Sequence, residues 1–191
     1  MIKRIFKTLG VLTFFGISLV SMYLVNLFYM KPASMDHYLA KELVVELFDS
    51  PEAMTYVGIF DRFSWLTKHS SKLSIPTESD RNEDISELED RLKTLQSYDI
   101  NKLSDIQKTT REIAIFDTKN NLKNKKEFYY HEFPLNQIGG IHLSTVEFLN
   151  SMHPIRNLSE ANALIDRAFQ IKAVFEGTRE SLEKQAKMGI Y

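Results

Sequence analysis

Residues 8–30 read TLGVLTFFGISLVSMYLVNLFYM, and this apolar stretch separates a short basic start from the rest of the chain. Lys3, Arg4 and Lys7 lie before the stretch, and the next charged residue is Lys31. About 20 apolar residues are enough for a helix to cross the hydrocarbon core of a bilayer. The stretch therefore predicts a transmembrane helix. The basic residues before it predict a cytoplasmic N-terminus, with the body of the chain outside the cytoplasm.

A cleaved signal peptide is the competing interpretation of the same stretch. The apolar region of a signal peptide usually has about 7–15 residues and ends at a small-residue cleavage site. Residues 8–30 exceed that length, and their exit sequence, NLFYMKPAS, has no clear A-x-A pattern. We therefore favour an uncleaved signal anchor in residues 1–30, and cleavage after Ser34 stays open. A lipoprotein anchor is excluded because the chain has no cysteine to acylate.

The composition excludes several classes of protein. The 191 residues are 43% hydrophobic and 26% charged, with 24 basic and 25 acidic side chains and no cysteine. These values exclude a disordered chain, a disulfide scaffold and a cysteine-ligated metal centre. The net charge of −1 argues against a nucleic-acid-binding protein, which normally carries a basic patch. Residues 31–191 are long enough to form one domain with its own core.

Helical periodicity dominates residues 31–191 and predicts a mainly α body. We expect helices from Asp36 to Phe48, from Ile85 to Gln96, from Ser104 through Phe116, over residues 144–149, and from Ser159 past Leu182. Ser104, and Ser144 with Glu147, have the spacing of helix caps, while Pro51 and Pro154 are expected to follow helix ends. The predicted fold is a transmembrane helix followed by an array of about five or six helices.

The segments between these helices are predicted to be loops. Phe60, Phe63 and Trp65 lie in the first loop, where aromatic side chains usually pack the loop onto the core. Residues 120–126, NNLKNKK, are expected to form a solvated turn. Only residues 128–133 hint at extended structure.

No catalytic motif is present in the sequence. His131 and Glu132 begin like the zinc-peptidase motif H-E-x-x-H, but Leu135 occupies the fifth position and Pro134 interrupts the helix that the motif needs. The other histidines share no ligand spacing, and the sequence has no G-x-S-x-G, P-loop or G-x-G-x-x-G pattern. We therefore assign neither catalytic nor metal-ligating residues to this chain.

The segment HEFPLNQIGG at residues 131–140 is the most unusual of the loops. It presents two neighbouring side-chain amides, Asn136 and Gln137, between Pro134 and the pair Gly139-Gly140. Side-chain amides can hydrogen-bond the backbone of an extended peptide, and glycines permit a close approach. The alternative is a structured connector whose amides cap neighbouring backbone groups.

Several stretches together resemble one bacterial family. They are SPEAMTYVGIFDRFSWLTKHS, LEDRLKTLQSYDINKLSDIQKTTREI, and FYYHEFPLNQIGGIHLSTVEFLNSMHPIRNLSEANALIDRAF with the ending EKQAKMGIY. Their order is similar to the start of the family catalogued as domain of unknown function 885. The resemblance covers roughly residues 36–191, and FPLNQIGG, FLNSMHP and KMGIY are its most specific pieces.

The resemblance implies a mostly helical, often exported protein that is similar to zinc-dependent peptidases. In that family the metal motif lies later in a longer chain, so zinc is implied for full-length members and no residue here matches a ligand. The matching part commonly walls the substrate channel, which makes Asn136 and Gln137 candidates for peptide contacts.

The resulting expectation is the N-terminal fragment of a peptidase-like protein, without activity of its own. Its body is expected on the periplasmic side of the bacterial inner membrane, anchored through residues 8–30. The alternative is a stand-alone, membrane-anchored helical module that binds a peptide or a partner protein. The sequence does not set the oligomeric state.

Overall fold

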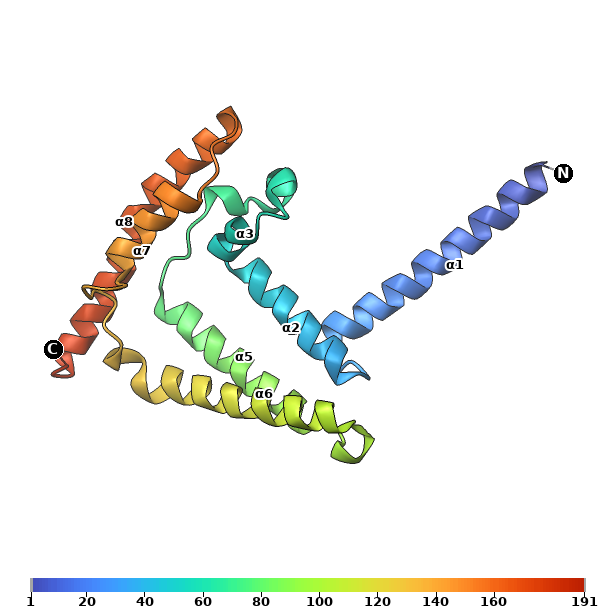
Figure 1. The fold of residues 1–191 in the computed structure, drawn as a ribbon, viewed down its shortest axis with the longest axis horizontal. Helices are drawn as coiled ribbons and strands as arrows, with labels where there is room; N and C mark the ends of the chain where they lie inside the picture. Colours follow the sequence, from blue (N-terminus) through green and yellow to red (C-terminus); the bar gives the residue numbers. More distant parts are fainter. Residues whose placement is uncertain (1, 191) are drawn as a thin grey trace.

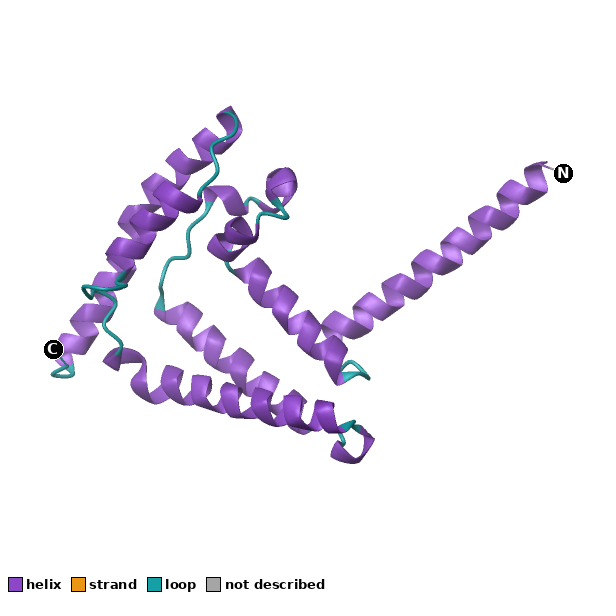
Figure 2. Cartoon of the chain, viewed as in Figure 1, coloured by secondary structure: helices purple, strands orange, loops and turns teal. Residues whose placement is uncertain are grey.

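The computed structural model describes residues 2–190, which form a helical body with one projecting helix (Figures 1 and 2). The α-helices are α1 (Ile2–Tyr29), α2 (Met35–Asp49), α3 (Pro51–Val57), α4 (Ser64–Thr67), α5 (Glu78–Gln96), α6 (Asp105–Lys123), α7 (Ile141–Glu147) and α8 (Leu158–Lys187). Short 3-10 or π-helical turns join them: η1 (Asp61–Phe63), η2 (His69–Ser71), η3 (Ile100–Lys102), η4 (Asn124–Phe128), η5 (Tyr129–His131) and η6 (Phe148–Met152). The described residues contain no strand, which confirms a mainly α fold.

Helix α1 projects away from the body (Figure 1), and its described apolar side chains are largely exposed to solvent. Its C-terminal end is held to the body, where the Tyr23 hydroxyl lies 3.1 Å from Nδ1 of His37. The side chains of the basic start lie outside the described residues. Among the residues that the structure describes, no helix has the length and apolarity needed to cross a bilayer.

Most predicted helices are confirmed, and the differences lie at their ends. The Ser104 hydroxyl accepts a hydrogen bond from the Gln107 backbone, and the Gln107 side chain accepts one from the Ser104 backbone, so α6 begins with a capping box. Pro51 starts α3 as its first residue, because a proline at that position needs no N–H partner. Helix α7 begins after Gly140, which corrects the predicted start at Ser144.

Three predicted irregular segments contain helical structure instead. The segment between Phe48 and Ile85 contains α3, η1, α4 and η2. Residues 120–126 continue α6 and enter the π-helical turn η4, so they are not a solvated turn. Residues 128–133, which hinted at extended structure, contain η5. Local polarity misled the prediction for residues 120–126, because Arg81 of α5 binds the Lys125 carbonyl oxygen at 2.9 Å through Nε and so stabilises that end of the helix.

A small apolar core lies where α2 meets the α5–α6 pair. It consists of Met35, Tyr38, Leu95 and Tyr98, all buried. The Tyr98 hydroxyl donates a 2.8 Å hydrogen bond to the Pro32 carbonyl oxygen, so the phenol remains satisfied inside the core. This cluster fixes the junction from which α1 leaves the body.

A buried arginine organises the other half of the body. Arg167 of α8 is fully buried, and its guanidinium donates to the carbonyl oxygens of Lys72 (2.8 Å) and His69 (2.9 Å) and to the Thr55 hydroxyl (2.7 Å). Its Nη1 lies 2.7 Å from Nδ1 of His153. No carboxylate contacts the guanidinium in the described structure, and burial lowers its pKa to about 10. The arginine thereby joins α3, η2 and α8.

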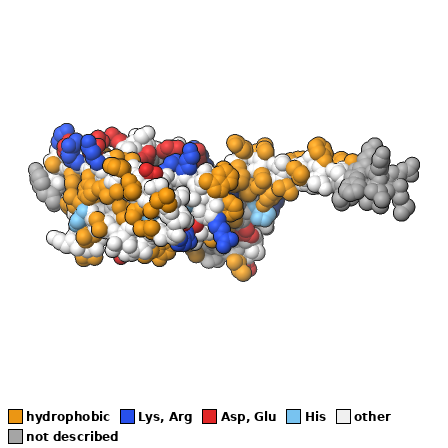
Figure 3. Space-filling model, turned by 90° about the horizontal axis from the view of Figure 1, so that it is seen from above, with side chains coloured by type: hydrophobic (Ala, Val, Ile, Leu, Met, Phe, Trp, Pro, Cys, Tyr) orange, Lys and Arg blue, Asp and Glu red, His pale blue; other side chains and the backbone are white. Residues whose placement is uncertain are grey.

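The aromatic residues of the first loop do not all pack inward. Phe60 is half-buried and contacts Phe48, which is itself exposed, with ring centroids 4.8 Å apart. Phe63 and Trp65 are instead 53% and 74% exposed, so the prediction that they pack onto the core is wrong. Figure 3 shows hydrophobic side chains spread over the surface of the body, beyond those of α1.

Candidate functional site

The predicted amide pair lies in an exposed loop between η5 and α7. Oδ1 of Asn136 accepts hydrogen bonds from the backbone N–H groups of Ile138 (3.0 Å) and Gly139 (2.8 Å). Its Nδ2 donates to the Phe133 carbonyl oxygen at 3.2 Å. Asn136 therefore holds the turn together, which is the connector role that the sequence left open.

Both side chains of the pair are exposed, but the Gln137 amide has no protein partner among the described residues. The loop that presents it is closed at its base, where the Ile141 N–H donates to the Pro134 carbonyl oxygen at 2.8 Å. Position 140 requires glycine, because a Cβ atom there would lie 2.5 Å from the backbone nitrogen of Asn136. The Asn136 side chain therefore stabilises the loop, whereas the Gln137 side chain can form hydrogen bonds with another molecule.

A groove of about 170 Å³ runs beside this loop. One wall is the chain from η5 to Pro134, and the other is the C-terminal half of α8. The lining residues are Pro76, Tyr129, Tyr130, Glu132, Phe133, Pro134, Ile141, Thr178, Ser181 and Gln185. We call this the aromatic groove. The loop that carries Gln137 connects two of its lining residues, Pro134 and Ile141.

Polar contacts hold both walls of the aromatic groove in place. The buried Gln185 of α8 donates through Nε2 to the Glu132 carbonyl oxygen at 2.6 Å. The Arg81 guanidinium stacks over the rings of Tyr129 and Tyr130, at 4.8 and 5.3 Å from their centroids. Apolar and aromatic walls beside the unpaired side-chain amide of Gln137 suit an extended peptide.

A second, acidic hollow of about 360 Å³ lies between α2 and the α5–α6 pair. Its lining includes the carboxylates of Glu42, Glu46, Asp49, Asp84 and Glu87. Partial burial is the main cause that raises the pKa of Glu87, and the negative charges of Asp49, Glu83 and Asp84 raise it further. Lys125 pairs with Asp84, which leaves the hollow negative overall.

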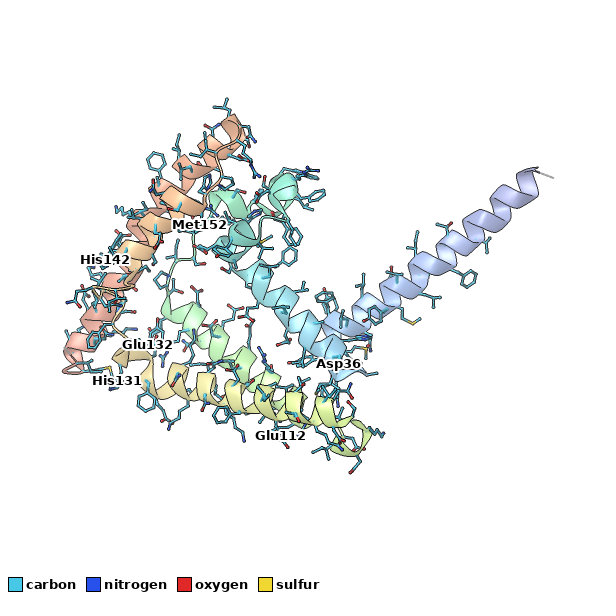
Figure 4. All side chains as sticks on the ribbon, in the orientation of Figure 1. Asp36, Glu112, His131, Glu132, His142 and Met152 are labelled. Atoms are coloured by element: carbon cyan, nitrogen blue, oxygen red, sulfur yellow. The ribbon has the colours of Figure 1, made fainter. Side chains whose placement is uncertain are left out.

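The histidines and carboxylates do not form a metal centre in the described part of the chain. No group of three or more His, Asp or Glu side chains there is arranged to hold an ion. Figure 4 shows His131 beside Glu132 at the turn after α6, while His142 lies apart from them on α7. The described residues therefore do not fit the zinc that the family resemblance implies.

The comparison with protein families decides the assignment of the chain. The model of the family described as "Bacterial protein of unknown function (DUF885)" matches residues 51–191. The chain belongs to this family. No curated protein and no solved structure matches the chain. The DUF885 match begins at the first residue of α3 and includes the loop of Asn136, the aromatic groove and the Arg167 network.

Sequence reasoning missed both the aromatic groove and the acidic hollow. The groove joins residues 129–134 to Thr178 and Gln185, about one-quarter of the chain away, and no local pattern links them. Tyr129 and Tyr130 could have indicated the groove, because two adjacent aromatic side chains in a charged segment need a packing partner. That partner is Arg81, from a different helix.

Proposed function

We propose that this DUF885 member is a membrane-anchored helical module that binds an extended peptide and lacks a catalytic site of its own. In this proposal it forms one wall of a substrate channel in a larger, peptidase-like helical protein. Asn136 shapes the loop, and Gln137 contacts the peptide backbone. The body, residues 31–191, lies on the periplasmic side of the bacterial inner membrane, and residues 1–30 are the anchor.

The aromatic groove is the observation that supports the proposed peptide binding. Its walls combine the rings of Tyr129 and Tyr130 with the apolar side chains of Phe133 and Ile141. Gln137 offers a donor and an acceptor at the loop beside it, and an extended backbone needs both. An aromatic wall with few polar groups favours peptides that carry apolar side chains.

The proposed membrane attachment rests on residues 8–30 and on the surface of α1. Described apolar side chains around the helix, such as Phe14, Phe15, Leu19 and Met22, are exposed. Such a surface is unfavourable in water and favourable in the hydrocarbon core of a bilayer.

The proposed larger assembly is supported by the unpartnered face of α6. Ile106, Ile113 and Phe116 are exposed at helical spacing, and Ile106 retains 82% of its surface. A soluble domain normally buries such a stripe against another element. A channel wall that packs against further helices would bury it.

Peptide binding can be tested with the full chain in lipid nanodiscs. The probe is a fluorescently labelled, unstructured decamer that carries two phenylalanines, and its anisotropy is followed with and without added Zn²⁺. We expect saturable binding, with no hydrolysis of the peptide in either condition. Gln137→Ala should weaken binding about tenfold or less, since it removes one or two hydrogen bonds. Stoichiometric zinc binding with hydrolysis of the peptide would overturn the proposal.

A further inference from the structure

One end of the body exposes an apolar surface that belongs to neither the aromatic groove nor the acidic hollow. Ile59, Phe63, Trp65 and Leu66 lie between the end of α3 and the end of α4, and more than half of the surface of each is exposed. Ile155 and Leu158, just before and at the start of α8, are exposed to a similar degree. We call these six residues the tip patch.

The two segments of the tip patch are joined directly. Arg156, which lies between Ile155 and Leu158, forms an ion pair with Asp61 at the start of η1. The same arginine also contacts the Glu160 carboxylate, at 3.0 Å. Residues almost one hundred positions apart in the sequence therefore form one surface, whose shape is fixed by paired charges.

The free charges around the tip patch are positive. Asp61 is the only acidic residue from position 53 to position 72, and its carboxylate is engaged by Arg156 and lies 3.7 Å from Nε2 of His69. Arg62 and Lys68 are exposed, and neither forms an ion pair within the described residues. An apolar surface that contains tryptophan and is bordered by free basic residues is typical of contact with an anionic lipid surface.

The position of the tip patch relative to α1 agrees with such a contact. Figure 1 shows that α1 and the end of the body with α4 and the start of α8 extend to the same side of the α1–α2 junction. In Figure 4, Met152 of η6 lies beside α3, and the chain continues from it to the start of α8. The junction itself is fixed, because Lys31 donates to the Ser97 carbonyl oxygen at 2.9 Å and stacks over Tyr98.

We propose that the tip patch is a second membrane-contact site, which docks the body onto the surface of the bilayer that α1 enters. The inference rests on the proposed anchoring through residues 8–30. Trp65 and Phe63 would lie at the level of the lipid headgroups, with Arg62 and Lys68 against anionic phosphates. The contact would fix the orientation of the aromatic groove relative to the membrane.

Trp65 provides the test, because it is the only tryptophan in the chain. The full chain is reconstituted into vesicles of phosphatidylcholine and phosphatidylglycerol, with bromine atoms on the acyl chains close to the headgroups. Bromine quenches tryptophan fluorescence on contact, so quenching reports lipid against Trp65. Retention of the chain in vesicles after an alkaline carbonate wash reports the anchor independently.

We expect the washed, retained chain to show strong quenching of Trp65. The double variant Phe63→Ser and Leu66→Ser should lose most of the quenching, while the control Ile106→Ser, a still more exposed apolar residue on α6, should keep it. Replacing Arg62 and Lys68 by glutamine should lower the quenching in anionic vesicles to the level in neutral vesicles.

A retained chain whose Trp65 is not quenched would overturn the inference and leave the anchoring intact. A shift of the emission to shorter wavelength only at high protein-to-lipid ratio would overturn it as well, because a second copy of the chain would then cover the patch. A chain that the wash removes would overturn the anchoring and this inference together.

Discussion

Replacing Arg167 by methionine is the most informative single perturbation of the body. Methionine replaces the aliphatic part of the arginine but has no donor, so four acceptors, three of them buried, lose their partner: the carbonyl oxygens of Lys72 and His69, the Thr55 hydroxyl and Nδ1 of His153. Each unsatisfied acceptor costs about 1–3 kcal/mol, and the desolvation cost of the guanidinium is recovered in part. We expect the free energy of unfolding to fall by about 3–5 kcal/mol.

The assay is helical circular dichroism of the full chain in detergent during thermal and urea unfolding. For a chain of this length, the expected loss corresponds to a fall in Tm of about 6–20 °C. Arg179→Met is the matched control, because Arg179 is on the same helix and forms only an exposed pair with Glu183. This control should change the free energy of unfolding by less than about 0.5 kcal/mol.

A double-mutant cycle separates the network from a general packing effect. Thr55→Val removes one acceptor of the guanidinium with little change in shape. Because the two changes share a contact, their combined effect should be smaller than the sum of the single effects by about 1 kcal/mol or more. A loss below about 1 kcal/mol for Arg167→Met, or strict additivity in the cycle, would refute the view that this arginine holds α3, η2 and α8 together.

Three further substitutions test the contribution of other contacts to stability. Gly177→Ala should destabilise the chain by about 1–3 kcal/mol, measured by thermal unfolding, because the new Cβ would lie 2.2 Å from the Pro76 carbonyl oxygen; Gly139→Ala, with nothing within 4 Å, is the control. Glu87→Gln should raise Tm near neutral pH, and the gain should vanish below about pH 4, because a raised pKa in the folded state disfavours the ionised form that dominates at neutral pH. His69 has a lowered pKa, caused mainly by burial, so stability should decrease as the pH falls below about 6.5, and His69→Gln should flatten that part of the profile.

The helices could be predicted because their signals are local. The Ser104 cap and the helical pattern of α8 lie within single segments, and both helices are confirmed. Asn157 caps α8 by accepting from the Glu160 N–H, so the helix begins one residue before the predicted start. The start of α5 was missed because Thr77 caps it ahead of a run of charged residues that has no apolar periodicity.

The candidate site could be predicted only in part, because its contacts are long-range. The loop of Asn136 and Gln137 stood out through its own residues, and the structure assigns the turn contacts to Asn136. The groove depends on Arg81, which stacks on tyrosines nearly fifty positions later. The exposure of Trp65 also could not be predicted from the sequence, since an aromatic residue in a loop packs inward in most proteins.

Filling the aromatic groove is the sharpest test of peptide binding by this chain. Ser181 of α8 lines the groove, and Ser181→Trp should occlude it, while Thr109→Trp on the exposed face of α6 is the control. Binding of the labelled decamer to the full chain in nanodiscs is measured by anisotropy. We predict that Ser181→Trp weakens binding at least about tenfold and that Thr109→Trp leaves it unchanged. Equal binding by the two variants, or no saturable binding by the unmodified chain, would contradict the proposed peptide site.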